Sequence, residues 1–360
     1  MQLNEDRRRR LAAIGWRDEP LPDDAAPWNV VRVIAQHRNG YRVHDGGEEF
    51  PAQPAPRFLR RDADPTLRPA VGDFVLAEAT TPLLIREVLP RRSVLSRAAA
   101  GERYQRQIIA TNIDSVFVVM GLDGDFNLRR IERYLALIRG SGVEAVIVLT
   151  KRDKVDNAAF LAASDSLRES LPAGVELHGV NAKDATSVAP LLVHLRSGDT
   201  AVLVGSSGAG KSTLTNTLLG VERQATNTVR EHDSRGRHTT THRALIALPS
   251  GGCLIDTPGM RELKLAGDEN LSEAGFEDIE ALALQCRFGD CAHVSEPGCA
   301  VRAALESGVL APERWANFVK LRSELAATNE TLEAQLRRKA QARVANKALT
   351  KRLSEKYRLS

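Results

Sequence analysis

A glycine-rich stretch that ends in Lys and Ser has the composition of a phosphate-binding loop. GSSGAGKST, Gly205–Thr213, fits the pattern G-x-x-x-x-G-K-[ST] without a gap. It follows the apolar stretch TAVLVG and opens a helical pattern, so backbone N–H groups and a helix N-terminus would face the phosphates. We expect Lys211 to reach the β- and γ-phosphates of a nucleotide and the Ser212 hydroxyl to coordinate Mg²⁺.

A second stretch could select the base. TKRD, at 150–153, follows the apolar run EAVIVL, which puts it at the carboxyl edge of a sheet, where α/β proteins bind ligands. Asp153 would accept hydrogen bonds from the guanine ring N–H and exocyclic amine, while the stem of Lys151 packs over the base. VNAKD, at 180–184, could supply the Ala182 backbone N–H to guanine O6. Alone, T-K-x-D is compatible with a surface turn; beside a phosphate loop it favours guanine binding.

A third stretch, DTPG at 256–259, has the D-x-x-G pattern of the other half of a GTPase phosphate site. Asp256 would hold Mg²⁺ through water, and the Gly259 N–H would sense the γ-phosphate. The preceding polar, threonine-rich segment predicts a mobile switch, in which we favour Thr240 as a further Mg²⁺ ligand. Met260 cannot orient water, so His238 is the nearest catalytic candidate; the alternative is a loop histidine that packs or contacts RNA.

The order of these stretches is unusual, because the base-reading loops precede the phosphate loop. A circular permutation explains it: rotated connectivity would leave the loops as neighbours in space. Two other classes stay open. One is a P-loop ATPase or small-molecule kinase with an incidental TKRD, and the other is a non-catalytic RNA-binding module that uses nucleotide as a structural ligand.

Three cysteines and one histidine, Cys286, Cys291, His293 and Cys299, follow one another closely. Such a Cys₃His set predicts one closed, tetrahedral, structural Zn²⁺ site with no open position for a catalytic water. The alternative is a group of buried thiols that never meet. The fourth cysteine, Cys253, lies in an apolar run and is expected to be an ordinary core thiol.

The fold class predicted from periodicity is α/β in the centre of the chain. Apolar strand-length runs at 115–120, 143–150, 175–180 and 201–205 alternate with helical patterns at 128–142 and 157–171. That alternation predicts a parallel, doubly wound sheet. Residues 243–259 predict a hairpin-like strand pair that ends in the DTPG loop.

The flanking regions differ from this centre. Short strands between Trp28 and Arg97, with frequent Gly and Pro, predict a small barrel of the oligonucleotide-binding type. Its arginines would suit nucleic acid: Arg32, Arg38, Arg42, Arg60 and Arg61. The predicted domains are a flexible segment at 1–27, the barrel at 28–97, the nucleotide-binding core at 98–270, a helical zinc domain at 271–330 and a basic tail at 331–360.

Length and charge bound the class of protein. A chain of 360 residues predicts two or three domains. The formal net charge is +4, and residues 331–360 hold nine Lys/Arg and two Asp/Glu, so the tail carries +7 and the remainder −3. The tail predicts a nucleic-acid-facing helix, although a solvated helix face stays open. The apolar runs are too short for a membrane span and no secretory signal is evident, so we expect a soluble cytoplasmic protein without membrane partners.

Taken together, these stretches resemble the RsgA (YjeQ) family of circularly permuted GTPases. VLPRRSVLSR, NIDSVFVV, DFNLRRIERYL, GSSGAGKSTL, GRHTTTHR, IDTPGMRE and CRFGDCAHVSEPGCAV carry the resemblance, over roughly residues 70–325. It implies an N-terminal oligonucleotide-binding barrel, a permuted core and a C-terminal zinc domain. It also implies hydrolysis of GTP to GDP and phosphate, stimulated by the small ribosomal subunit, and a role in that subunit's late maturation.

Site residues follow by motif from this resemblance. His238 takes the family's proposed catalytic position, and Lys211 and Ser212 its phosphate and Mg²⁺ contacts. Thr150 stands where the family usually has Asn, and Asn181 where Ser is common. The full set expected around GTP or GDP is Thr150, Lys151, Asp153, Asn181, Ala182, Gly205, Ser206, Ser207, Gly208, Ala209, Gly210, Lys211, Ser212, Thr213, Thr240, Asp256 and Gly259. The expected partners are the small subunit and its 16S-type rRNA, bound by a chain that is a monomer when free.

Overall fold

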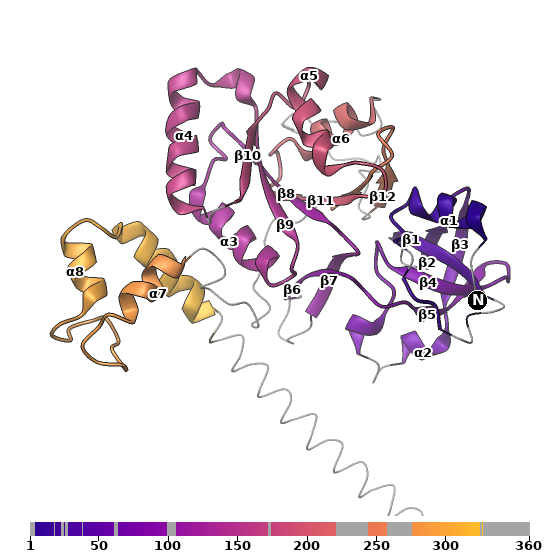
Figure 1. Ribbon diagram of the computed structural model, residues 1–360, viewed down its shortest axis with the longest axis horizontal. Coiled ribbons are helices and arrows are strands. Elements are labelled where there is room, and N and C mark those ends of the chain that lie inside the picture. The colour runs from indigo at the N-terminus through magenta and orange to yellow at the C-terminus, as the bar shows by residue number, and fades with distance from the viewer. Residues whose placement is uncertain are drawn as a thin grey trace, which may run out of the picture.

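The computed structural model describes residues 4–17, 19–22, 25, 28–37, 39–60, 64–98, 106–171, 174–220, 244–257, 276–324 and 326. A β-barrel, an α/β core and a helical part follow one another across the molecule (Figure 1), with the core between the other two. Within these described ranges, no helix has both the length and the apolar character that a membrane span requires.

The barrel is built from five strands: β1 Asn29–His37, β2 Gly40–His44, β3 Glu49–Pro54, β4 Phe74–Glu78 and β5 Leu83–Val88. β1 pairs with both β2 and β4, β2 pairs with β3, and β5 joins β3 to β4, so the ring closes. Alternate side chains such as Val31, Val33 and Val43 fill its interior. The helical turns α2 (Pro56–Leu59) and η2 (Pro65–Leu67) lie between β3 and β4. The predicted barrel is thereby confirmed.

Residues 4–17 form a helix and a turn that pack on the barrel, which differs from the flexible segment predicted at 1–27. Helix α1 (Glu5–Ala12) begins after Asn4, whose side chain accepts a hydrogen bond of 2.9 Å from the Arg7 N–H. Leu11, Ile14 and Trp16 are buried against the barrel residues Phe74 and Leu76. The prediction failed because these apolar side chains are few and pack on a strand surface formed far along the chain.

The core sheet contains β8 Ser115–Gly121, β9 Glu144–Thr150, β10 Glu176–Gly179, β11 Thr200–Gly205, β12 Ala244–Ala247 and β13 Cys253–Asp256, in the order β10-β9-β8-β11-β13-β12. All neighbours pair in parallel except β12 and β13, which form the predicted antiparallel hairpin. Cys253 is a buried core thiol in β13, as predicted.

Helices cover both faces of this sheet. They are α3 Leu128–Arg139, α4 Asn157–Ser170, α5 Ala185–Val188 and α6 Lys211–Leu219, with the 3₁₀ turns η3 Arg152–Lys154 and η4 Ala189–His194. Figure 1 shows α3 and α4 on one face and α5 and α6 on the other. Along β8, Val116 and Val118 pack into the first layer while Phe117 and Val119 pack into the second. The doubly wound prediction is confirmed.

A small hairpin, β6 (Val94–Ala98) with β7 (Arg106–Thr111), packs on the core rather than joining the barrel. Leu95 and Ile109 belong to the same buried cluster as α3. The barrel strands therefore end at Val88, before the boundary of 97 predicted for that domain. One further link joins the two parts, because β1 pairs with β12 at Ala35 and Ala244.

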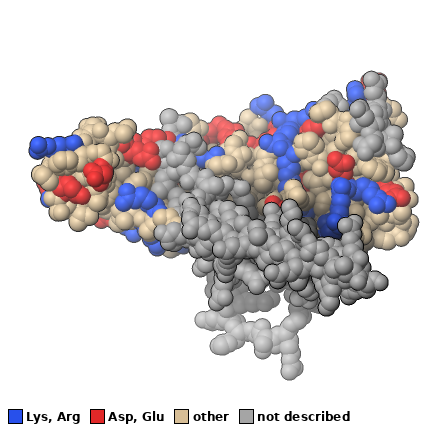
Figure 2. Space-filling model, turned by 90° about the horizontal axis from the view of Figure 1, so that it is seen from below, with Lys and Arg blue, Asp and Glu red and all other residues tan. Residues whose placement is uncertain are grey.

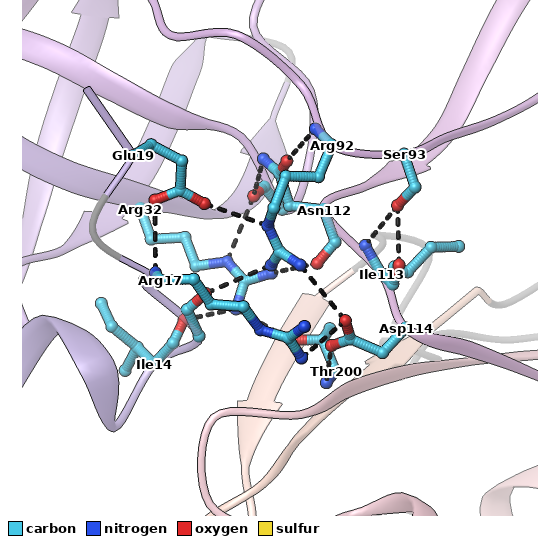
Figure 3. A network of polar contacts seen from close by, with 12 residues as sticks. Ile14, Arg17, Glu19, Arg32, Arg92, Ser93, Asn112, Ile113, Asp114 and Thr200 are labelled. Atoms are coloured by element: carbon cyan, nitrogen blue, oxygen red, sulfur yellow. Dashed lines mark hydrogen bonds and ion pairs between the residues drawn. The ribbon is translucent and has the colours of Figure 1, made fainter. Parts of the chain in front are cut away.

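Arg32 occupies the junction between barrel and core (Figure 3), which corrects its predicted place on a nucleic-acid surface. The side chain is fully buried. Its guanidinium donates to the Gly72 carbonyl at 3.1 Å, the Asn112 carbonyl at 3.0 Å and the Thr200 hydroxyl at 3.0 Å, and also to the Ile14 carbonyl. Burial lowers its pKa to about 10, so it stays charged at neutral pH. The Arg32 guanidinium thus links the barrel, the N-terminal segment and the core by hydrogen bonds.

The helical part lies at the opposite end of the core from the barrel (Figure 1). It comprises α7 (Glu277–Ala283), α8 (Ala300–Glu306) and a helix over 312–324. Arg314 joins it to α3 through Glu132, at 3.0 Å, and Asn317 donates to the same carboxylate. Burial raises the pKa of Glu132, although both partners oppose that effect.

Candidate nucleotide site and cysteine cluster

The predicted nucleotide-binding loops meet at one edge of the core sheet. β9, β10, β11 and β13 run in the same direction, and each is followed directly by one of the motifs. TKRD follows β9, NAK follows β10, the glycine-rich loop follows β11, and Asp256 ends β13. The carboxyl edge of the sheet therefore collects segments that are far apart in the chain, in the way that open α/β sheets bind ligands.

The glycine-rich loop takes the backbone conformation that its glycines permit. Gly205, Gly208 and Gly210 have φ values of 147°, 81° and 92°. A Cβ on Gly205 would lie 2.1 Å from the Val119 carbonyl oxygen, so only glycine fits there. Gly210 precedes α6, and the N-terminus of that helix faces the loop. Ser207 and Gly208 at the tip are exposed, while Ala209 is buried.

Lys211 folds back along this loop. Its ammonium group donates to the Gly205 carbonyl at 2.7 Å and to the Ser206 carbonyl at 2.5 Å. Burial lowers its pKa, and the Asp256 and Asp125 carboxylates act against that shift. Asp256 is 6% exposed at the end of β13. The predicted phosphate-binding cation and the predicted Mg²⁺-holding carboxylate thus lie within electrostatic reach of one another.

Thr150 joins the loop after β9, predicted to read the base, to the glycine-rich loop after β11. Its side chain is fully buried, and its hydroxyl donates to the Ala209 carbonyl at 2.5 Å. Residue 150 ends β9 and residue 209 lies in the loop after β11, so the bond crosses the intervening strand β8. This contact joins the two motifs whose order in the chain is reversed.

Lys151 and Asp153 take different positions in the base-reading loop. Lys151 has a φ of 60° and pairs with Asp123 at 2.5 Å, and its hydrogen bond lowers the pKa of that carboxylate. A Cβ on Gly121 would lie 3.1 Å from the Lys151 Nζ, so glycine there leaves room for the lysine stem. Asp153 lies exposed in η3. No hydrogen bond or ion pair links its carboxylate to another described residue.

The loop after β10 is held against both neighbouring loops. The Arg152 N–H donates to the Val180 carbonyl at 3.2 Å. The Ala182 carbonyl accepts from the Thr217 hydroxyl of α6 at 2.6 Å, and the Asn181 N–H donates to the Ser187 hydroxyl at 2.8 Å. The structure therefore brings the loops after β9 and β10, which are predicted to read the base, and helix α6 into one connected unit.

Two acidic residues of the site were missed by sequence reasoning. Asp123 pairs with Lys151, and Asp125 accepts a hydrogen bond from the Ser206 hydroxyl while Arg130 holds it at 2.6 Å. Both follow β8, whose end lies between the other loops. The sequence signal that could have identified them is the stretch GLDGDF, which directly follows an apolar strand. Ser212 and Thr213 are half-buried in the first turn of α6. The predicted residues His238, Thr240 and Gly259, and Met260, lie outside the described residues.

The cysteine cluster brings its four predicted ligands together. The ligand atoms of Cys286, Cys291, His293 and Cys299 all lie within 4.8 Å of one another. The Cys286 and Cys299 sulfurs are 3.9 Å apart, and the His293 Nδ1 lies 3.5 Å and 3.4 Å from them. The alternative of thiols that never meet is therefore wrong. Trp315 packs edge-on to the His293 ring at 5.6 Å, which holds the imidazole in place.

Comparisons with known proteins agree with this architecture. The model of a family described as RsgA GTPase matches residues 88–266. Two proteins named Small ribosomal subunit biogenesis GTPase RsgA, from Xanthomonas oryzae pv. oryzae (strain MAFF 311018) and Xanthomonas axonopodis pv. citri (strain 306), are each 55% identical, with 91% of both chains covered.

Solved structures give the same fold. YjeQ from Thermotoga maritima matches with a TM-score of 0.58 and 26% identity, over 83% of this chain and 99% of that chain. YloQ, described as a circularly permuted GTPase, matches with a TM-score of 0.56 and 22% identity, over 86% of this chain and 98% of that chain. The prediction of rotated connectivity is thereby confirmed.

Proposed function

The chain belongs to the RsgA GTPase family, and from this we propose that it hydrolyses GTP to GDP and phosphate while assisting late maturation of the small ribosomal subunit. The observation that carries the GTPase assignment is the hydrogen bond from the Thr150 hydroxyl to the Ala209 carbonyl. It supports the proposal because it joins the loop after β9 to the glycine-rich loop, so that one nucleotide could contact both.

Base selection falls to the exposed Asp153 carboxylate. It would accept hydrogen bonds from the ring N–H and exocyclic amine of guanine, which adenine does not present in that arrangement. Lys151 lays its stem over the base, and the Ala182 N–H donates to guanine O6. Asn181 precedes Ala182, and its side chain accepts the Lys183 N–H at 3.1 Å, which supports the turn of the loop.

The phosphates would lie over Gly205–Thr213, where backbone N–H groups and the N-terminus of α6 face them. Lys211 would exchange its two backbone carbonyls for phosphate oxygens, which are stronger partners because they are charged. Ser212, Thr240 and Asp256 would hold Mg²⁺, which when bound would neutralise negative charge on the phosphates. Gly259 would contact the γ-phosphate, and His238 would orient the attacking water.

The Cys₃His cluster fits structural Zn²⁺. With Zn–S near 2.3 Å and Zn–N near 2.0 Å, tetrahedral ligand atoms lie about 3.5–3.8 Å apart, which matches the separations of 3.4–3.9 Å among Cys286, His293 and Cys299. Cys291 completes four ligands. A closed donor set of this kind stabilises the fold without acting on substrate.

The small ribosomal subunit is the proposed partner, because relatives that are 55% identical to this chain are named as GTPases of small ribosomal subunit biogenesis. We assign rRNA contact to the barrel and the basic tail at 331–360. Figure 2 shows Lys and Arg side chains over the barrel end of the molecule and its junction with the core. Arg42, Arg57 and Arg60 of the barrel part are exposed. We therefore propose that the protein acts in the cytoplasm, where ribosomal subunits mature. We also propose that it is a monomer when it is not bound to the subunit.

Steady-state hydrolysis of GTP and of ATP, each with and without purified small subunits, tests the proposal. We expect GTP to be preferred and its hydrolysis to rise on addition of subunits. Preference for ATP would favour an ATPase or kinase. Tight GTP binding without hydrolysis in either condition would favour an RNA-binding module with a structural nucleotide. Large ribosomal subunits serve as the matched control.

A further inference from the structure

Three potential metal ligands lie together on the edge of the core sheet, away from the cysteine cluster. Glu176 and His178 belong to the edge strand β10, and His194 ends η4. Residues two apart on a strand point to the same face, so both β10 side chains reach the same point as His194. Their ligand atoms all lie within 4.8 Å of one another.

The separations suit a small, tightly coordinated cation. The Glu176 Oε2 lies 3.1 Å from the His178 Nε2 and 3.3 Å from the His194 Nε2. Ligand bonds of about 2.0–2.2 Å to zinc, arranged tetrahedrally, put neighbouring donors about 3.3–3.5 Å apart. The Glu176–His194 separation fits this range, and the Glu176–His178 pair, which is hydrogen-bonded, would open slightly on binding an ion. The two imidazole rings are inclined by 75° with their centroids 6.1 Å apart, so they converge rather than stack.

His194 gives an independent reason to expect a ligand. Its side chain is 8% exposed, and among the described residues its Nε2 has no hydrogen-bond partner, although the Glu176 carboxylate lies within ion-pair distance. The Phe117 ring packs edge-on against the imidazole at 5.9 Å, which fixes its orientation. A buried nitrogen without a hydrogen bond costs desolvation free energy, and a metal ion would recover that cost.

We propose that Glu176, His178 and His194 form a second metal site, for a divalent transition ion of the Zn²⁺ class. Two imidazoles and one carboxylate are ligands that Zn²⁺ accepts, and three protein ligands leave a fourth position open to water. Glu176 and His178 remain partly exposed, which gives the ion a path of entry. This site differs from the cysteine cluster, whose four ligands close its coordination shell.

The site would also fix a loop. His178 and His194 flank the segment that contains Asn181 and Ala182, so an ion bound to both would tie the ends of that segment together. On the proposed function, this segment contacts guanine, and bound metal should then slow nucleotide release. The metal site itself does not depend on that function, because its ligands are described without reference to nucleotide.

Isothermal titration of nucleotide-free, full-length protein with Zn²⁺, after its cysteine site has been loaded and excess metal removed, tests the proposal. We expect one further Zn²⁺ per chain. His178→Ala and Glu176→Gln should each weaken that event by at least about tenfold. His37 is exposed and lies on β1, far from these three ligands, so His37→Ala is the control variant. It should leave the affinity for the additional Zn²⁺ unchanged. His194→Gln replaces the buried ligand, and thermal unfolding would verify that this variant is folded.

Co²⁺ added to the zinc-loaded protein gives a second measurement that needs no variant. Visible absorption of four- or five-coordinate Co²⁺ without a thiolate charge-transfer band is expected, because the site has no sulfur. A charge-transfer band would mean exchange at the cysteine cluster. The proposal is overturned if no Zn²⁺ binds beyond the cysteine site, or if binding persists undiminished in both His178→Ala and Glu176→Gln. Neither result would bear on GTP hydrolysis.

Discussion

Replacing Thr150 by Val removes the hydroxyl that joins the loop after β9 to the glycine-rich loop after β11 and leaves the side-chain volume almost unchanged. In the wild type this hydroxyl donates to the Ala209 carbonyl at 2.5 Å, in a place where Thr150 is fully buried. The Ala209 side chain is also buried. In the variant, the carbonyl of the phosphate loop would lose a partner that water cannot easily replace.

The magnitude follows from that loss. A buried polar group left without its hydrogen bond costs about 1–3 kcal/mol, which corresponds to roughly five- to 150-fold in an equilibrium constant. Part of this free energy should appear as lower stability against urea. The rest should appear as weaker nucleotide binding, because a loop released from Thr150 must be ordered when GDP binds.

Two measurements on three proteins decide the point. Urea unfolding and the affinity for a fluorescent GDP analogue would be compared for wild type, Thr150→Val and Thr150→Ser. The Ser variant keeps the hydroxyl and loses only a methyl group, so it should bind GDP far better than the Val variant. If Thr150→Val matches wild type in both measurements, the hydroxyl does not fasten the loops. If Thr150→Ser, which keeps the hydroxyl, is impaired as much as Thr150→Val, the hydroxyl does not account for the loss.

Three other predictions concern the supports of the site. Arg32→Met should lower the free energy of unfolding by about 3 kcal/mol or more, because several buried acceptors lose their shared donor; urea denaturation measures this, and a loss below about 1 kcal/mol would contradict it. Cys299→Ser should reduce bound zinc from about one equivalent and lower the melting temperature, as elemental analysis and calorimetry would show; full zinc retention would rule out its role as a ligand. Hydrogen bonds from its own N–H and those of Ala292, Ser295 and Val294 hold the pKa of Glu296 at about 2. Its stabilising effect should therefore be present above the unfolded value of 4.5 and be lost as pH falls toward 2; a carbon-13 NMR midpoint near 4.5 would contradict this.

Local patterns predicted the parts of the fold that depend on short stretches of chain. Apolar runs gave the core strands to within a residue or two, and strand–loop–helix context identified the glycine-rich loop. The helix predicted over 128–142 ends at Arg139. Gly140 follows it, and glycine has a low helix propensity. The Cys₃His spacing likewise predicted a cluster that the structure assembles.

Long-range contacts account for what could not be predicted. Arg32 was grouped with the other arginines of the predicted oligonucleotide-binding barrel, yet its side chain is buried and hydrogen-bonds to a residue as distant in the chain as Thr200. Trp16 packs on Phe74, with ring centroids 4.9 Å apart, although it belongs to the segment that was predicted to be flexible. His194 meets Glu176 only after η4 folds back on the sheet. The local sequence around each residue does not predict contacts between such distant parts of the chain.

The nucleotide preference of Asp153→Asn tests the central claim most directly, namely that the loop after β9 reads guanine over the phosphate loop after β11. Xanthine carries an oxygen where guanine has its exocyclic amine, so an Asn side chain can donate where Asp accepted. We predict that the variant binds GDP roughly a hundred-fold more weakly than wild type and prefers XDP. If the variant binds GDP as tightly as wild type does, and discriminates against XDP as strongly, Asp153 does not contact the base and the proposed site is wrong.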